Sequence, residues 1–255
     1  MRRVGAIARN TIREVARERV ALVLALFGVG LVGVSLVLSP LALGEGKKVV
    51  TDFGLAGASA LATLLTIVLG SSLLYKELDR KTIYAVMAKP IRRSEFLLGK
   101  YAGLWVSAAA LLASMVAITL ALLAATTRSV PWEAVGALLL SLAELSIVTA
   151  VVIFFSSFTT PLLTAFFGAA TLLAGHFAED LKYFGSQGSS PVLAGATEAA
   201  YWLLPHLELF NARGLVVHGQ AVAPERLAFA GAYAALYAGA LLAAAAAIFE
   251  RRDFR

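Results

Sequence analysis

The stretch YKELDRKTIYAVMAKPIRRSEFLLGK, residues 75–100, is a charged loop between two long apolar runs. It holds seven lysines and arginines against Glu77, Asp79 and Glu95. When the flanking runs cross a membrane, a basic excess of this kind is typical of a cytoplasmic loop. The length of those runs therefore decides the class of fold.

The apolar runs are long enough to cross a membrane. The chain has 255 residues, of which 60% are hydrophobic and 15% charged, whereas soluble domains carry about 25% charged residues. Five windows account for the deficit: four contain no charged residue, and the fifth, Ala134–Ala178, contains Glu144 alone. Each reaches the roughly 20 residues that a transmembrane helix needs, and Ser156–Pro161 (SSFTTP) divides the fifth. The sequence therefore predicts an all-α polytopic membrane protein.

Six transmembrane helices are expected in a single transmembrane domain, residues 1–255. Their approximate limits are 20–39, 53–75, 101–126, 134–155, 161–178 and 227–249. Residues 1–19 show helical apolar spacing with six arginines elsewhere, which predicts an amphipathic helix at the membrane interface. Residues 179–226 form an exterior segment that is too apolar for an ordinary loop. Short re-entrant helices, sheltered by protein, would satisfy both the apolar side chains and the backbone.

The distribution of positive charge predicts the orientation. The N-terminal segment, the cytoplasmic loop 76–100 and the C-terminal tail hold sixteen lysines and arginines, against six on the opposite side. This bias places both termini in the cytoplasm. We expect the chain to lie in the inner (cytoplasmic) membrane of the cell. The net charge of +6 is thus orientation information rather than a sign of nucleic-acid binding. The absence of cysteine excludes disulfides and thiolate metal sites.

A short helix with one apolar face is predicted inside the charged loop. Thr82 can cap this helix, and Lys89-Pro90 ends it, because proline disfavours helical geometry in the preceding residue. Its apolar face consists of Ile83, Val86 and Met87. Apolar anchors flanked by charges suit docking into a groove of another protein. The alternative is a loop that only anchors the flanking helices to lipid headgroups.

Two residue patterns connect the chain to a known family. The first, E-x-D-R-K-T-I-Y-x-x-x-x-K-P-I-x-R-x-E-F-L-L-G-K-Y, runs from Glu77 to Tyr101, and the second, LLPHLELFNAR, occupies Leu203–Arg213. With the basic tail FERRDFR, they resemble the permeases of the type-2 exporter family of ABC transporters. The branch containing the permease of the nitrous-oxide-reductase maturation transporter looks most similar. His206 stands where that branch usually has asparagine.

The resemblance implies a function and partners. In this family two permease chains pair with two ATP-binding subunits, so we expect a second copy of the chain, which would make a homodimer, and two copies of a separate ABC ATPase. The chain has no G-x-x-x-x-G-K-[ST] phosphate loop, so ATP and Mg²⁺ would be bound by that partner. The chain is thus predicted to be a non-enzymatic permease subunit of an ATP-driven exporter, with no cofactor or metal of its own and an unidentified substrate.

The resemblance also implies roles for individual residues. Residues 77–93 would form the coupling helix seated in the ATPase, and the exterior helices would close an outer gate. The ATPase-coupling candidates are Glu77, Arg80, Lys81, Thr82, Ile83, Tyr84, Val86, Met87, Lys89, Pro90 and Arg93. The gate candidates are Pro205, His206, Phe210 and Asn211.

Glu144 is the polar candidate inside the membrane, with Ser141 one turn before it. Because a buried ionisable residue is costly in lipid, it defaults to a functional hypothesis such as a substrate or proton path. An equally weighted alternative is a protonated carboxyl group hydrogen-bonded to Ser141 or to a neighbouring helix. An intramembrane enzyme using Glu144 and a histidine is a rival class, but no second catalytic group lies within two turns in the sequence. A non-transporting scaffold that transmits force to a partner is another.

Smaller signals remain. The three histidines, His176, His206 and His218, are scattered, which favours local polar contacts over a metal site. The spacing Gly99-x-x-x-Gly103 predicts close helix packing, although the sequence does not name the partner helix.

Overall fold

The structure is a computed structural model that describes residues 2–39, 45–79, 92–127, 131–187 and 191–251. All regular elements in these ranges are helices, which confirms the all-α prediction. They are α1 (Arg2–Arg17), α2 (Arg19–Leu38), α3 (Gly46–Asp79), α5 (Arg93–Thr127), α6 (Ala134–Ser156), α7 (Pro161–His176), α8 (Ala178–Gln187), α9 (Pro191–Leu203), the 3₁₀ helix η2 (Leu207–Phe210), α10 (Arg213–Val217) and α11 (Pro224–Arg251). Among the described residues, four helices are each long and apolar enough to span a membrane, and two bent pairs raise the number to as many as six.

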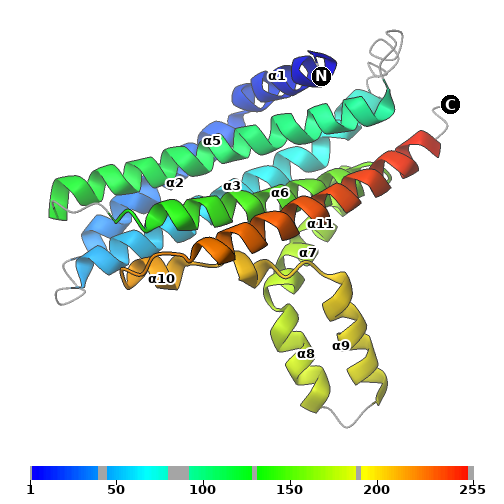
Figure 1. The fold of residues 1–255 in the computed structure, drawn as a ribbon. Coiled ribbons are helices and arrows are strands. Elements are labelled where there is room, and N and C mark those ends of the chain that lie inside the picture. Colours follow the sequence, from blue (N-terminus) through cyan, green and yellow to red (C-terminus); the bar gives the residue numbers. More distant parts are fainter. Residues whose placement is uncertain (1, 40–44, 80–91, 128–130, 188–190, 252–255) are drawn as a thin grey trace.

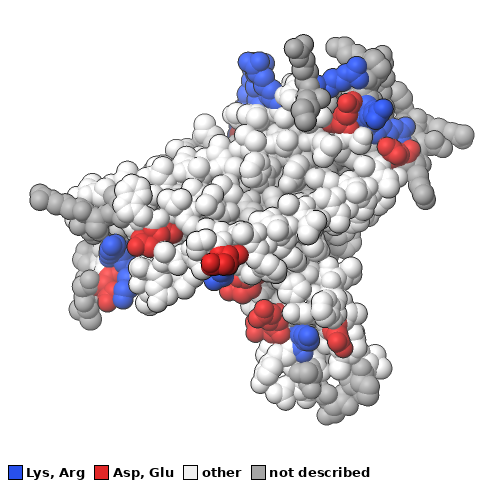
Figure 2. Space-filling view, viewed as in Figure 1, with Lys and Arg blue, Asp and Glu red and all other residues white. Residues whose placement is uncertain are grey.

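The long helices lie side by side in an elongated bundle, with both chain termini at the same end (Figure 1). Helix α6 lies at its centre and contacts α3, α5, α7 and α11. This position explains why α6 is apolar on nearly all sides, since a helix surrounded by other helices has no solvent-facing stripe. In Figure 2 a broad uncharged surface separates the charged side chains at the two ends of the bundle.

Helices α3 and α5 are longer than the spans predicted for them. They contain 34 and 35 residues, which corresponds to about 50 Å each, against a hydrocarbon core of about 30 Å. The apolar windows 53–75 and 101–126 cover only their middle parts. The helices continue through charged residues because backbone hydrogen bonds do not require apolar side chains. Lys76, near the end of α3, forms an ion pair with Glu18, with Nζ 2.6 Å from Oε1.

Helix α1 packs along the first turns of α5, and this contact identifies the partner of Gly99 and Gly103. A Cβ atom at Gly103 would lie 2.7 Å from the carbonyl oxygen of Ala8, so only glycine permits the approach. Thr11 and Val15 on the same face of α1 are buried, whereas Arg9 and Arg13 are exposed. The amphipathic helix predicted over residues 1–19 therefore has its apolar face covered by α5; its placement at a membrane surface stays a prediction.

The fifth predicted span, 161–178, corresponds to α7, whose last residue lies two positions before the predicted limit. Helix α7 begins at Pro161 but ends at His176, and the chain then bends by 68° into α8. With 16 residues, α7 is about 24 Å long. Helices α8 and α9 pack on each other and project from the bundle (Figure 1). They occupy the segment predicted to hold re-entrant helices, and Phe184 and Trp202 are largely exposed among the described residues. Re-entry into the membrane stays a prediction.

Candidate functional site

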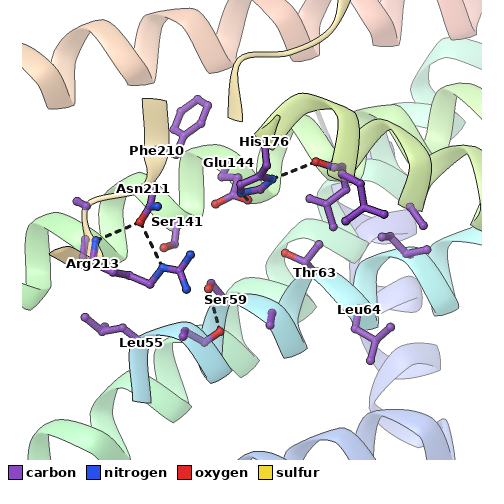
Figure 3. Close-up of a pocket in the computed structure, with 18 of the residues that line it drawn as sticks. Leu55, Ser59, Thr63, Leu64, Ser141, Glu144, His176, Phe210, Asn211 and Arg213 are labelled. Atoms are coloured by element: carbon purple, nitrogen blue, oxygen red, sulfur yellow. Dashed lines mark hydrogen bonds and ion pairs between the residues drawn. The ribbon is translucent and has the colours of Figure 1, made fainter. Parts of the chain in front are cut away.

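A cavity of about 570 Å³ lies between α3, α6, α7 and the segment that leads into α10 (Figure 3). This volume falls in the range of roughly 300–1,000 Å³ that is typical of small-molecule sites. Most of the lining is aliphatic or aromatic, including Leu55, Leu172 and Phe210. The polar lining residues are Ser59, Thr63, Ser141, Glu144, His176, Asn211 and Arg213. Both intramembrane candidates, Glu144 and Ser141, thus face the same cavity.

Glu144 pairs with a histidine from the next helix. His176 Nε2 lies 3.5 Å from Glu144 Oε1, and the Glu144 side chain is only 12% exposed. The other ring nitrogen, Nδ1, lies 3.0 Å from the carbonyl oxygen of Leu172, which can only accept, so Nδ1 carries a hydrogen. Nε2 therefore faces the carboxyl group, and the two groups can share one further proton. With that proton the pair has no net charge, whichever of the two groups holds it.

The pairing was not visible in the sequence, because Glu144 and His176 belong to different helices. The turns next to Glu144 on α6 offer no second catalytic group, whereas the α6–α7 hairpin brings His176 from the end of α7. Among the described residues, the polar contact of the Glu144 carboxyl group is with His176. Ser141 lines the same cavity without a hydrogen bond to Glu144 in that part of the chain.

Side chains of α11 hold the loop 203–213 against the bundle. Tyr237 Oη donates to the carbonyl oxygen of Leu203 at 2.9 Å, and the His206 backbone N–H donates to Tyr233 Oη at 3.0 Å. Arg226 Nη2 donates to the carbonyl oxygens of Leu209 and Asn211, at 3.0 and 3.1 Å. The loop is therefore fixed through its backbone, which leaves the side chains of Phe210 and Asn211 to line the cavity.

The other two gate candidates lie beside the cavity rather than in its lining. The Pro205 carbonyl oxygen rests on Gly175 of α7, where a Cβ atom would lie 2.7 Å from it. The ring of His206 packs against Tyr201, with 4.3 Å between ring centroids. Pro205 and His206 therefore fix how the loop sits between α7 and α11, and a gate at this place stays a prediction.

Arg213 is the cavity residue that sequence reasoning missed. It was counted only as a charge in the exterior segment, although it lies in the pattern LLPHLELFNAR, two residues after Asn211. Its Nε and backbone N–H both donate to Asn211 Oδ1, at 3.3 and 3.4 Å. The side chain then reaches into the cavity towards Ser59 and Ser141 (Figure 3). The spacing Asn-x-Arg, Asn211 to Arg213, is the sequence signal that could have pointed to Arg213 as a cavity residue.

At the opposite end of the bundle, the start of α5 is joined to both α11 and α1. Arg93 Nη1 donates to the carbonyl oxygens of Phe249 and Glu250, at 2.7 and 3.1 Å, in the last turn of α11. On α1, the Glu14 carboxylate accepts from Lys100 Nζ at 3.2 Å, and the Lys100 side chain is only 1% exposed. We call residues 92–103, with these contacts, the α5 junction.

Two of the predicted coupling residues lie in described helices. Arg93 lies in the α5 junction, and Glu77 lies near the end of α3. The remaining candidates, Arg80, Lys81, Thr82, Ile83, Tyr84, Val86, Met87, Lys89 and Pro90, lie outside the described residues. Within the described ranges, no group of three or more histidine or acidic side chains could hold a metal ion.

Comparison with known proteins assigns the family. No curated protein matches the chain at a significant level. The family described as ABC-2 family transporter protein matches residues 6–254, and this match runs from the second turn of α1 to beyond α11. The multi-pass helical architecture agrees with that assignment. The chain therefore belongs to the ABC-2 family of transporter proteins, as a membrane permease component of an ABC transporter.

Proposed function

We propose that the chain is the permease subunit of an ATP-driven exporter, and that a separate ABC ATPase drives it through residues 77–93. One observation carries the proposal: α3 runs without a break from the wall of the cavity to the start of that loop. The family assignment and the absence of a phosphate loop in the sequence support the division of labour between the two subunits.

Helix α3 is the mechanical link in this proposal. Ser59 and Thr63 line the cavity, and the helix ends at Asp79, about 24–30 Å further along its axis. An α-helix is hydrogen-bonded along its whole length, so a displacement of its end also moves the cavity wall. The α5 junction provides the second path, because Arg93 and Lys100 connect the exit of the loop to α11 and α1.

Transport would follow from movement of two such bundles. ATP-driven closure of the ATPase pair would push on residues 77–93 of each permease copy, and the bundles would rock and open a path past the exterior loop 203–213. The orientation proposed from the basic loops puts both termini in the cytoplasm. The chain itself would lie in the inner membrane. Helix α2 exposes a broad apolar face, which lipid or the second copy would cover: Leu22, Val23, Leu26 and Phe27.

Co-purification with candidate ATPases tests the proposal. The variant Ile83→Asp/Val86→Asp/Met87→Asp should lose the ATPase while the permease still folds, because charges on the docking face prevent its burial. Gln220→Asp, which adds a charge at an exposed residue in the exterior segment, is the control and should retain the ATPase. If the triple variant still binds the ATPase normally, docking through this helix is wrong.

Reconstituted vesicles separate transport from force transmission alone. ATP-dependent flux supports the exporter, whereas ATPase stimulation without flux supports a scaffold that transmits force to a partner. Alternating access and lateral extrusion are both compatible with the link through α3. The finer resemblance to the nitrous-oxide-reductase maturation branch stays a prediction, and the neighbouring genes, which should encode the ATPase and any cargo-handling protein, test it.

A further inference from the structure

The cavity contains one arginine, Arg213, whose guanidinium group forms no ion pair with a described carboxylate. Glu144 contacts His176, whose Nδ1 faces the Leu172 carbonyl oxygen, and the pair carries no net charge when Nε2 and the carboxyl group share one proton. Arg213 also faces the cavity, and Asn211 Oδ1, a neutral acceptor, takes its Nε and backbone N–H. Among the described residues, no carboxylate forms an ion pair with Arg213, and its terminal N–H groups have no hydrogen-bond partner. Arg213 thus presents a positive charge to the cavity, where the carboxyl group of Glu144 lies within electrostatic range of both Arg213 and Glu208.

The position of that charge is fixed. Asn211 holds Arg213 through two hydrogen bonds, and Arg226 holds Asn211 through its carbonyl oxygen. The outer edge of the guanidinium group, with parallel N–H donors, matches the two oxygens of a carboxylate or phosphate group. The hydroxyl group of Ser141 lies beside it and can donate to the same oxygens, whereas the Ser59 hydroxyl group donates to the carbonyl oxygen of Ala56 at 3.1 Å (Figure 3).

The rest of the cavity and its mouth are apolar. Leu64, Leu173 and Phe177 line it and are 45%, 60% and 58% exposed, so the cavity opens at an apolar rim between α3 and α7. A ligand that enters here passes over aliphatic and aromatic surface before it reaches Arg213. This arrangement suits a molecule with an acidic head and an apolar body, since each part then meets a matching surface.

We propose that the cavity binds a small amphipathic anion, with its carboxylate or phosphate group on Arg213 and its apolar part between α3 and α7. Glu144 is not a direct ligand of the anion; when it shares a proton with His176, it does not oppose the bound group. As a statement about cargo, this inference rests on the proposed permease function, whereas the binding itself does not require transport. The acidic head could come from a membrane lipid or from a free fatty acid.

Direct binding to the purified full-length chain tests the site without ATP and without the ATPase. Displacement of a fluorescent fatty acid is measured with dodecanoate, with lyso-phosphatidate and with the cationic dodecyltrimethylammonium. The anions should compete and the cation should not. The anion that competes at the lower concentration identifies the source of the acidic head: dodecanoate indicates a free fatty acid, and lyso-phosphatidate indicates a membrane lipid. Stronger competition by the cation would overturn the proposal.

Variants locate the binding at Arg213. Arg213→Gln should weaken anion binding roughly 10- to 100-fold, because charge-assisted hydrogen bonds are lost. Arg213→Lys should have an intermediate affinity, because it keeps the positive charge but lacks the two parallel N–H donors of the guanidinium group. Arg19→Gln, which removes an exposed arginine at the start of α2, is the matched control and should bind normally. Glu144→Gln should retain or strengthen binding.

Two outcomes would contradict the site. Unchanged affinity in Arg213→Gln, with thermal unfolding like that of the parent, excludes Arg213 as the anion contact. A comparable loss in Glu144→Gln would instead indicate a zwitterionic or cationic ligand. Because neither measurement involves ATP, a failure here leaves the exporter proposal standing, and a failure of ATPase docking leaves the binding result unaffected.

Discussion

The two ends of the bundle differ in how their charged groups are partnered. At the α5 junction, Lys100 is buried against Glu14, and Arg93 donates to carbonyl oxygens of α11. In the cavity, near the opposite end, Glu144 has His176, but no described carboxylate forms an ion pair with Arg213, whose side chain reaches into the cavity (Figure 3). The comparison indicates that the junction is built to hold helices together, whereas the cavity keeps a polar group available for a ligand.

The largest expected effect comes from the close approach at the junction. Gly103→Leu should destabilise the fold by about 3 kcal/mol or prevent folding, because the new side chain meets Thr11 and the backbone of Ala8. Gly239→Leu in α11 is the matched control, since the space around Gly239 is open, and it should be neutral or slightly stabilising. Expression level and thermal unfolding in detergent measure both. Equal behaviour of the two variants would mean that α1 does not pack on α5 as described.

The buried ion pair at the junction should come next. Lys100→Met is expected to cost about 1–3 kcal/mol, because Lys100 is buried and Glu14 loses its counter-charge. Glu14→Leu combined with Lys100→Met should recover part of that loss. The exposed pair of Lys48 with Glu45 offers the control: Lys48→Met should change stability by less than about 0.5 kcal/mol. If Lys48→Met destabilised the fold as much as Lys100→Met, burial would not distinguish the two ion pairs.

A smaller effect on stability is expected where α5 meets the end of α11. Arg93→Met removes two hydrogen bonds to the last carbonyl groups of α11 and should cost about 1 kcal/mol, while Arg93→Lys keeps part of the contact. Hydrogen exchange of the last turn of α11 measures the effect. Protection that stays unchanged in Arg93→Met would show that this contact does not hold α11.

In the cavity, we expect the smallest change in the free energy of unfolding together with a large change in transport. Glu144→Gln keeps the size of the side chain and should change unfolding by less than about 1 kcal/mol. If Glu144 serves the substrate path, transport in vesicles should nevertheless fall by roughly 10-fold or more. Full transport by a normally folded Glu144→Gln protein would show that the carboxyl group is only a structural partner of His176.

The sequence predicted the class of fold because long apolar windows have few alternatives in a membrane. It predicted less well where helices continue through charged residues, as α3 does through Lys76, because hydropathy records lipid exposure and not helix length. Contacts between helices were the features that the sequence predicted least. Nothing local in the sequence links Glu144 to His176, or Gly103 to Ala8, since each pair depends on how two helices pack. Arg213 was read as an exterior charge, because its position in the cavity depends on Asn211 and on the backbone contacts from α11.

The link through α3 is the central claim, and one measurement tests it directly. The chain has no cysteine, so Ser59→Cys introduces a single reporter in the cavity wall, about 30 Å along α3 from Asp79. In the complex with the ATPase, the rate of maleimide labelling is compared with and without trapped ATP. We predict that ATP changes this rate, and that the change disappears in Ile83→Asp/Val86→Asp/Met87→Asp. A labelling rate that ignores ATP, or an ATP effect that survives the loop substitutions, would contradict the link.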